Sequence, residues 1–255
     1  MDDSQRLRYA RHLLLDGFGE HSQERLLASH ALVIGAGGLG STALLFLASS
    51  GVGRITVADG DVVDLTNLQR QVVHRNSSVG MNKAVSAATT LAALNPEVAV
   101  QPIEERVEGA RLQSLVAEAD VVLDCSDNFL TRHAINAACV QARVPLVSGA
   151  GIRFDGQVAV FDSRGADAPC YHCLFPRGPG EEERCATLGV FAPVVGVVGT
   201  LQAMEAIKLL AGMGEPLAGR LLLFDGRASR WHEVRIARDP SCSTCSGGAG
   251  IPEDK

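Results

Sequence analysis

Short apolar segments alternate along the chain with longer segments whose apolar residues recur at helical spacing. Five apolar segments have the length and composition of buried strands, at residues 31–34, 55–57, 98–103, 121–124 and 145–151. Helical patterns lie before and between them, at residues 4–29 with a break at two glycines, 41–51, 82–94, 111–118 and 129–143. Strands that alternate with helices are typical of a parallel sheet covered on both faces.

The pattern changes after residue 151. A further strand is predicted at 156–161, a long apolar helix at 192–210, and a hairpin from the strands 221–224 and 231–236. The sequence therefore predicts an α/β, Rossmann-like fold, with a mostly parallel sheet flanked by helices and antiparallel C-terminal strands. We expect one domain over residues 1–255, composed of N-terminal helices (1–29), a nucleotide-binding core (30–151), a cysteine-bearing part (152–246) and a disordered tail (247–255).

Composition narrows the function classes. The chain has 255 residues and a formal net charge of −6, with no basic run, which argues against a nucleic-acid partner. Its longest apolar segments are interrupted by glycine, serine or charge, so no membrane span is expected. The acidic, polar start of the chain is unlike a signal peptide. We therefore predict a cytoplasmic protein.

A glycine-rich segment, Gly35-Ala36-Gly37-Gly38-Leu39-Gly40, follows the first predicted strand and opens a helix. Gly35 and Gly37 permit a tight turn, and the helix N-terminus beyond them favours an anion. Asp59 follows the second strand, about where an acceptor for ribose hydroxyls belongs. The segment predicts a nucleotide site, and by itself it favours an NAD enzyme and an ATP enzyme equally.

Polar side chains follow the later strands at the same edge of the sheet. Asn67 and Arg70 lie in a polar segment after the second strand, which a plain turn would also explain. Lys83 stands in the first turn of a helix, where a cation is unfavourable unless an anion is near. Asp127 follows the fourth strand and is either a magnesium ligand or the N-cap of the next helix.

The seven cysteines point to a metal rather than to disulfides. Four of them form two C-x-x-C pairs, at Cys170 and Cys173 and at Cys242 and Cys245. Two such pairs predict a tetrahedral zinc site, and four thiolates leave no position open for a substrate, so the role is structural. Cys185 lies between the pairs in a Gly-, Pro- and Glu-rich segment that is expected to be a mobile loop.

In combination these motifs resemble the E1-like adenylyltransferase family, the MoeB/ThiF/HesA group. The likeness extends from Tyr9 to Cys245 and rests on Arg11, the glycine segment, Asp59, residues 67–71, Lys83, residues 124–128 and the paired C-x-x-C motifs. The resemblance implies a reaction of ATP with a small ubiquitin-like sulfur-carrier protein. The C-terminal glycine carboxylate of the carrier attacks the α-phosphate, pyrophosphate leaves, and an acyl-adenylate forms.

The resemblance also implies roles for individual residues. Asp127 would hold Mg²⁺, Arg70 and Lys83 would neutralise phosphate oxygens, and Asp59 would accept the ribose hydroxyls. The full set expected around ATP is Gly38, Asp59, Thr66, Asn67, Leu68, Gln69, Arg70, Lys83, Asp127 and Asn128. Members of the family are homodimers in which an arginine like Arg11 reaches the active site of the partner.

The carrier is expected to end in Gly-Gly and to bind the part formed by residues 152–246. The small subunit of molybdopterin synthase is the first expectation. The alternative is the thiamine sulfur carrier, for which Cys185 would form a covalent bond. No rhodanese-like segment follows Cys245, so the sulfur donor would be a separate protein.

Two other classes of function are open. An NAD-dependent oxidoreductase would share the glycine segment, but it would leave Asn67, Arg70 and Lys83 without a common purpose. A non-catalytic zinc scaffold that binds a ubiquitin-like partner would tolerate Asp127→Ala without loss of function.

Overall fold

Eight strands form one continuous sheet in the computed structural model, which describes residues 1–176 and 189–246. The strand order is β3-β2-β1-β4-β5-β6-β7-β8. The strands β3, β2, β1, β4 and β5 are parallel, and the later strands pair antiparallel. Their bounds are β1 (His30–Ile34), β2 (Arg54–Ala58), β3 (Ala99–Ile103), β4 (Val121–Asp124), β5 (Leu146–Ile152), β6 (Asp155–Phe161), β7 (Arg220–Asp225) and β8 (Arg230–Arg235).

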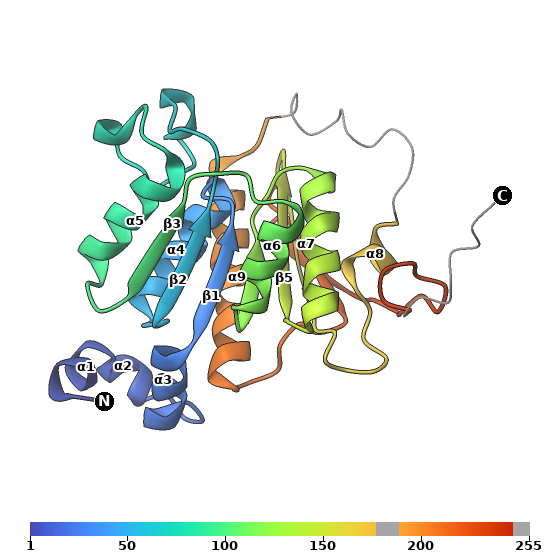
Figure 1. The fold of residues 1–255 in the computed structure, drawn as a ribbon, viewed down its shortest axis with the longest axis horizontal. Helices are drawn as coiled ribbons and strands as arrows, with labels where there is room; N and C mark the ends of the chain where they lie inside the picture. Colours follow the sequence, from blue (N-terminus) through green and yellow to red (C-terminus); the bar gives the residue numbers. More distant parts are fainter. Residues whose placement is uncertain (177–188, 247–255) are drawn as a thin grey trace.

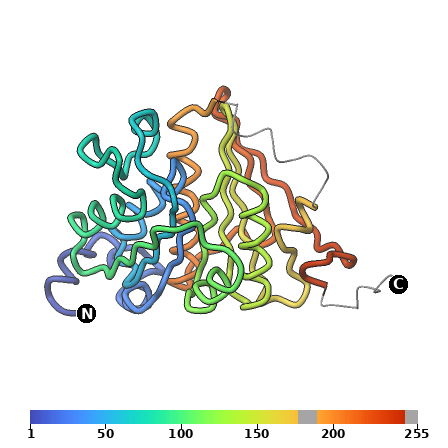
Figure 2. The backbone as a smooth tube through the Cα atoms, turned by 45° about the horizontal axis from the view of Figure 1, so that its top comes forward, coloured from blue at the N-terminus to red at the C-terminus, as the bar shows by residue number. Residues whose placement is uncertain are grey.

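Helices cover both faces of the parallel strands (Figure 1). They are α1 (Asp3–Arg8), α2 (Ala10–Leu13), α3 (Gly19–Ala28), α4 (Gly38–Ser49), α5 (Lys83–Leu94), α6 (Gly109–Ala117), α7 (Phe129–Ala142), α8 (Tyr171–Leu174) and α9 (Ala192–Ala211). Short 3-10 turns lie at η1 (Leu65–Asn67) and η2 (Asn76–Ser78). Figure 2 shows the antiparallel strands at the edge of the sheet that is remote from the N-terminus.

The core has two layers because strand side chains alternate between the faces. In β1, Ala31 and Val33 pack with residues of α4, α5 and α9. Leu32 and Ile34, on the opposite face, pack with residues of α6 and α7. Both faces of β1 are therefore buried, which explains its continuous apolar run. The α/β fold with antiparallel C-terminal strands, predicted from the sequence, is confirmed.

Helix α9 packs along α4. A Cβ atom on Gly199 would collide with the carbonyl oxygen of Leu39 and the hydroxyl of Thr42, so only glycine permits this approach. At Gly196, by contrast, a Cβ atom would make only an ordinary contact of 3.9 Å with Thr42 Cγ2. By length and mean hydropathy α9 would also suit a membrane span, yet 56% of that stretch is buried inside the molecule, as in a core helix.

The N-terminal segment forms α1, α2 and α3 at the amino ends of the strands (Figure 1). Tyr9 is buried between α1 and α2, and its hydroxyl accepts a hydrogen bond of 2.9 Å from Asn95 Nδ2. The apolar stripe of these helices is only partly used within the chain, since Leu7 is 80% exposed and Leu14 is 74% exposed. The stripe is thus a surface that another molecule can cover.

Candidate active site

A cavity of about 630 Å³ lies at the carboxyl ends of β1, β2 and β4, the position where open parallel sheets bind ligands. The loops after these strands line it, and the loop at residues 105–108 after β3 closes one side. The structure brings six of the sequence-predicted site residues into this lining: Gly38, Asp59, Arg70, Lys83, Asp127 and Asn128. The volume is within the range of small-molecule sites.

The glycine segment makes the turn from β1 to α4. Gly35 has φ of +97°, and a Cβ atom there would lie 2.7 Å from the carbonyl oxygen of Cys125. Gly38, which was expected in the set around ATP, also has a packing role. A Cβ atom on Gly38 would point at Val195 of α9, 2.8 Å from its Cγ2 atom. Packing against α9 therefore requires glycine at this position, although Gly38 still lines the cavity.

Asp59 connects the ends of β1 and β2. Its Oδ2 atom accepts a hydrogen bond of 2.8 Å from the backbone N–H of Ala36, and Oδ1 accepts one of 2.9 Å from the N–H of Asp61. These contacts orient the carboxylate toward the glycine segment. Each oxygen retains a further lone pair, so the group can still accept hydrogen bonds from a ligand.

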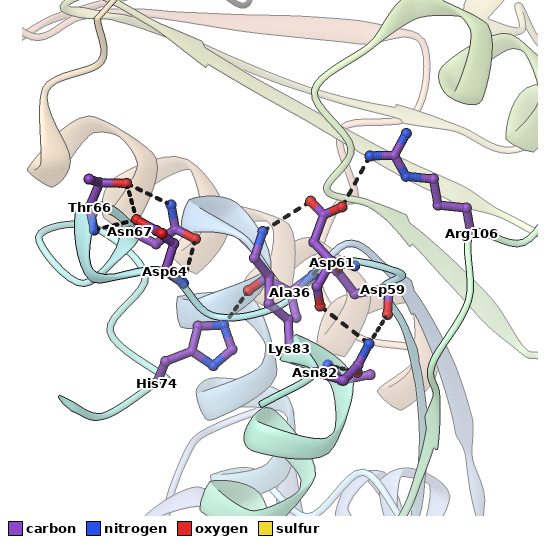
Figure 3. A network of polar contacts seen from close by, with 11 residues as sticks. Ala36, Asp59, Asp61, Asp64, Thr66, Asn67, His74, Asn82, Lys83 and Arg106 are labelled. Atoms are coloured by element: carbon purple, nitrogen blue, oxygen red, sulfur yellow. Dashed lines mark hydrogen bonds and ion pairs between the residues drawn. The ribbon is translucent and has the colours of Figure 1, made fainter. Parts of the chain in front are cut away.

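Asp61 explains how a lysine is tolerated in the first turn of α5. Lys83 is only 8% exposed, and its Nζ atom lies 3.2 Å from Asp61 Oδ2. The other oxygen of Asp61 lies 3.0 Å from Nη2 of Arg106 (Figure 3). Burial pushes the pKa of Asp61 up, but the hydrogen bonds from Arg106 and Lys83 outweigh burial and hold it below the usual value. Asp61 is the nearby anion that the sequence required.

His74 supports the glycine segment from below. Its Nε2 atom lies 2.9 Å from the carbonyl oxygen of Ala36 (Figure 3). Its Nδ1 atom lies 2.9 Å from Ser86 Oγ of α5. Burial lowers the pKa of His74, and the charge of Lys83 lowers it further. A carbonyl oxygen only accepts, so the neutral ring donates from Nε2 to Ala36 and accepts from Ser86 at Nδ1.

The end of β4 carries the predicted magnesium ligand. Asp124 is fully buried, and its carboxylate accepts hydrogen bonds from the N–H and hydroxyl of Ser126 and from the hydroxyl of Ser148. The side chain of Asn128, not that of Asp127, caps α7, because it accepts a hydrogen bond of 2.9 Å from the N–H of Thr131. The alternative interpretation of Asp127 as the N-cap was therefore wrong.

Several predicted site residues lie elsewhere. Thr66 and Asn67 form a capping box with Asp64 in η1, and the residues Thr66, Asn67, Leu68 and Gln69 are outside the cavity lining. Arg11 is exposed on α2, at the amino ends of the strands and so at the opposite end of the sheet. Cys185 lies outside the described residues.

Sequence reasoning did not single out six further charged residues of the lining, which are Asp61, Glu105, Arg106, Glu108, Arg132 and Asp155. Arg132 is 8% exposed, and its Nη2 atom donates to the carbonyl oxygen of Ser126 at 2.8 Å. The sequence did hold a signal for Arg132 as a site residue: it lies one helical turn after Asn128, on the first turn of α7, which lies at the end of β4. Asp61 belongs to the same polar segment as Asn67 and Arg70. Only its ion pairs with Lys83 and Arg106, which are distant in sequence, distinguish it from the other polar residues of that segment.

The two C-x-x-C pairs meet beside α8. The Sγ atoms of Cys170, Cys173, Cys242 and Cys245 all lie within 4.8 Å of one another. The separations are 3.6 Å from Cys170 to Cys242, 3.5 Å from Cys173 to Cys245 and 3.9 Å from Cys170 to Cys173. A tetrahedron with zinc–sulfur bonds of about 2.3 Å has edges of about 3.8 Å, so the cluster is compatible with zinc. Figure 2 shows the two segments side by side.

Burial makes this cluster costly without a cation. Desolvation raises the pKa of the Cys170 thiol, so a thiolate at that position needs a compensating positive charge. Asn136 of α7 donates from Nδ2 to Cys170 Sγ at 3.5 Å and accepts at Oδ1 from the N–H of Tyr171. These two hydrogen bonds connect the first pair to α7.

The fold and the cavity define a nucleotide-binding α/β enzyme of Rossmann type with an added four-cysteine cluster. The chain belongs to the ThiF family, whose model matches residues 9–244, and the resemblance seen in the motifs is thus confirmed. It is 44% identical to the molybdopterin-synthase adenylyltransferase of Escherichia coli (strain K12), over 96% of this chain and 98% of that protein. It is also 44% identical to the sulfur carrier protein ThiS adenylyltransferase of the same organism, over 99% and 100% of the two chains.

A solved structure shares the fold. The structure of Escherichia coli MccB with AMPCPP and MccA superposes with a TM-score of 0.83 and 26% sequence identity, over 96% of this chain and 74% of that one. That relative is a protein solved with a nucleotide analogue, which agrees with a nucleotide cavity in the shared fold.

Proposed function

We propose that this chain uses ATP to adenylate the C-terminal glycine of a ubiquitin-like sulfur-carrier protein. The observation that carries the proposal is the cavity at the carboxyl ends of the strands. It gathers Asp59, Arg70, Lys83 and Asp127 around the glycine segment. A nicotinamide enzyme would not need two cations and a second carboxylate beside that segment, whereas a triphosphate with Mg²⁺ does.

In this proposal each residue binds a different part of the nucleotide. Asp59 accepts the ribose hydroxyls, while Arg70 and Lys83 neutralise phosphate oxygens. Asp127 holds Mg²⁺, which supplies further charge neutralisation on the phosphates when bound. One carboxylate oxygen of the carrier then forms a bond to the α-phosphorus, and the bond from that phosphorus to the bridging oxygen of pyrophosphate breaks. Catalysis by these side chains consists of positioning and charge neutralisation.

The carrier that we propose first is the small subunit of molybdopterin synthase. The thiamine sulfur carrier is the second candidate, since the two adenylyltransferase relatives are equally identical to this chain. In that case Cys185 would form the covalent bond. A separate protein would donate the sulfur, and the cytoplasm is the location we predict.

Exchange of labelled pyrophosphate into ATP, measured with a panel of purified carriers that end in Gly-Gly, tests this proposal. Exchange that depends on one carrier and on its terminal glycine is the expected result. Absence of exchange with every carrier, together with reduction of a nicotinamide cofactor, would instead favour the oxidoreductase alternative. Cys185→Ser separates the two carriers, because only covalent use of Cys185 makes sulfur transfer sensitive to that substitution.

We further propose that the enzyme is a homodimer in which Arg11 enters the active site of the partner. Two observations support this. Arg11 lies at the opposite end of the sheet from the cavity of its own chain, and the same N-terminal segment exposes three apolar side chains, at Leu7 of α1 and at Leu14 and Leu15 after α2. The polar segment beside the cavity exposes a second apolar set, Val62, Leu65 and Val72. Because both sets are apolar, each can bury the other set of the partner subunit across a twofold interface.

Complementation between inactive variants tests the trans arrangement. Arg11→Ala and Asp127→Ala should each be inactive alone. After subunit exchange at equal concentrations, half of the dimers are mixed and each has one complete site, so about one quarter of wild-type activity should return. If Arg11 acted within its own chain, each mixed dimer would lack a complete site and the mixture would stay inactive.

We propose zinc as the ion of the four-cysteine cluster. The four thiols leave no position open for a substrate, so the ion would fix the segment near residue 245 to α8 and α7 rather than take part in the reaction.

A further inference from the structure

Arg106 is a cavity residue that the proposed reaction does not yet use. It lies on the loop between β3 and α6, in the lining of the cavity, and its side chain is 77% exposed. Its guanidinium is nevertheless held in place, because Nη2 lies 3.0 Å from Asp61 Oδ1. Figure 3 shows Arg106 reaching from its own loop toward Asp61 on the loop after β2.

The backbone of Arg106 is fixed more tightly than its exposure suggests. A Cβ atom on Gly60 would lie 2.8 Å from the backbone nitrogen of Arg106 and 2.9 Å from its Cγ atom. The absence of a side chain at Gly60 therefore lets the loop after β3 pack directly on the loop after β2. Packing against Gly60 therefore positions the backbone and Cγ atom of Arg106, and the ion pair with Asp61 positions its guanidinium.

The order of the strands indicates which part of the nucleotide lies nearest. β1, β2 and β3 are consecutive neighbours in the sheet. In the proposed function, phosphates lie at the glycine segment after β1 and the ribose lies at Asp59 after β2. The next strand in the same direction is β3, so the adenine base, which follows the ribose in the nucleotide, must lie at the loop after β3.

We propose that the guanidinium plane of Arg106 covers the adenine base of bound ATP, with Asp61 holding that plane in position. A guanidinium stacks on aromatic faces and is weakly hydrated, so it suits a flat heterocycle at the mouth of a cavity. A second phosphate contact is disfavoured because Arg106 lies on the loop after β3, two strands away from the glycine segment after β1. Arg106 is thus a binding residue for the nucleoside end, and this inference rests on the proposed use of ATP.

Equilibrium binding with two ligands tests the inference without any carrier. The dissociation constants of Mg²⁺–ATP and of Mg²⁺–tripolyphosphate, which has no base, are measured by calorimetry on the full chain. Arg106→Ala should weaken ATP binding about tenfold, or about 1.4 kcal/mol, and leave tripolyphosphate binding within about twofold. Arg106→Lys keeps the charge but loses the plane, so it should weaken ATP binding about as much.

Arg111→Ala is the matched control. Arg111 is a half-exposed arginine of the neighbouring helix α6, paired at 3.5 Å with Glu105 and outside the cavity lining. It should change neither dissociation constant. Unchanged melting temperatures would show that the exposed substitutions leave the fold intact.

Three results would overturn the inference. Equal weakening for ATP and tripolyphosphate would mean that Arg106 contacts phosphate. Full rescue by Arg106→Lys would mean that only its charge matters. No effect of Arg106→Ala would reduce Arg106 to a surface ion pair. Failure of the wild-type protein to bind ATP at all would contradict the proposed function instead, so the two failures are distinguishable.

Discussion

The nucleotide cavity and the cysteine cluster are two sites of one molecule that different forces hold in place. The side chains that we propose to bind the nucleotide follow the parallel strands β1, β2 and β4, which backbone ladders and two buried layers already fix. The cluster joins two short segments, and 72 residues separate each thiol from the one it meets across the cluster. Its second segment, after β8, has no comparable strand ladder around it.

This difference decides what a substitution does in the cavity and what it does in the cysteine cluster. A side chain at the mouth of the cavity can be removed while the strands beneath it remain paired. A buried thiol of the cluster cannot, because the ion that we propose there would also connect the two segments. We therefore expect cavity variants to lose activity at full stability and cluster variants to lose stability first.

The largest effect is expected from Asp127→Ala. Loss of the carboxylate that we propose to hold Mg²⁺ should reduce adenylation about 10³-fold, as for the loss of one strong electrostatic contact to a transition state. The melting temperature and the zinc content should stay at wild-type values, measured by calorimetry and elemental analysis. Asp127→Asn, which keeps the shape, should be about equally inactive. Loss of zinc or of soluble protein would show that Asp127 has a structural role instead.

A smaller effect, in free energy, is expected from Cys170→Ala. It should abolish stoichiometric zinc and lower the free energy of unfolding by more than about 3 kcal/mol, because both a metal bond and a buried partner are lost. Cys139→Ala is the matched control, since Cys139 is a buried thiol of α7 outside the cluster. The control should keep its zinc and lose only the smaller energy of a cavity in the core. Full zinc stoichiometry in Cys170→Ala would contradict a four-cysteine site.

The smallest expected effect is a loss of stability at low pH, caused by two buried histidines. Burial lowers the pKa of both His74 and His30 below the ordinary value of about 6.5. The unfolded chain then binds more protons than the folded chain as the pH falls below about 6.5. The stability that these neutral rings contribute is therefore fully present above that pH and is lost on acidification.

Urea unfolding at pH 7.5 and 5.5 measures this loss, which should be smaller than that of Cys170→Ala. The variant His74→Gln should show a flatter dependence on pH than the wild type. Comparison with the variant removes the contribution of zinc release, because both proteins carry the same cluster. An equal slope in both would contradict a contribution from His74.

Much of the fold and part of the site followed from local signals. The runs at 31–34 and 121–124 had the continuous apolar character that burial on both faces imposes, and the structure places both in the parallel sheet. The C-x-x-C pairs predicted the cluster because few other arrangements bring four thiols together at that spacing. At Gly38 the structure adds a constraint that no local signal shows, since a side chain there would collide with Val195, more than 150 residues away.

The sequence by itself determined the order of strands and helices, the nucleotide turn and the thiol pairs, because periodicity, turn sterics and ligand spacing act over a few residues. Only the tertiary structure decided that Asp61 joins Lys83 and Arg106, that Asn128 rather than Asp127 caps α7, and that Arg11 lies at the opposite end of the sheet from the cavity. These arrangements depend on contacts between distant segments. The pairing of strands brings such segments together, and no local pattern records which side chains then meet.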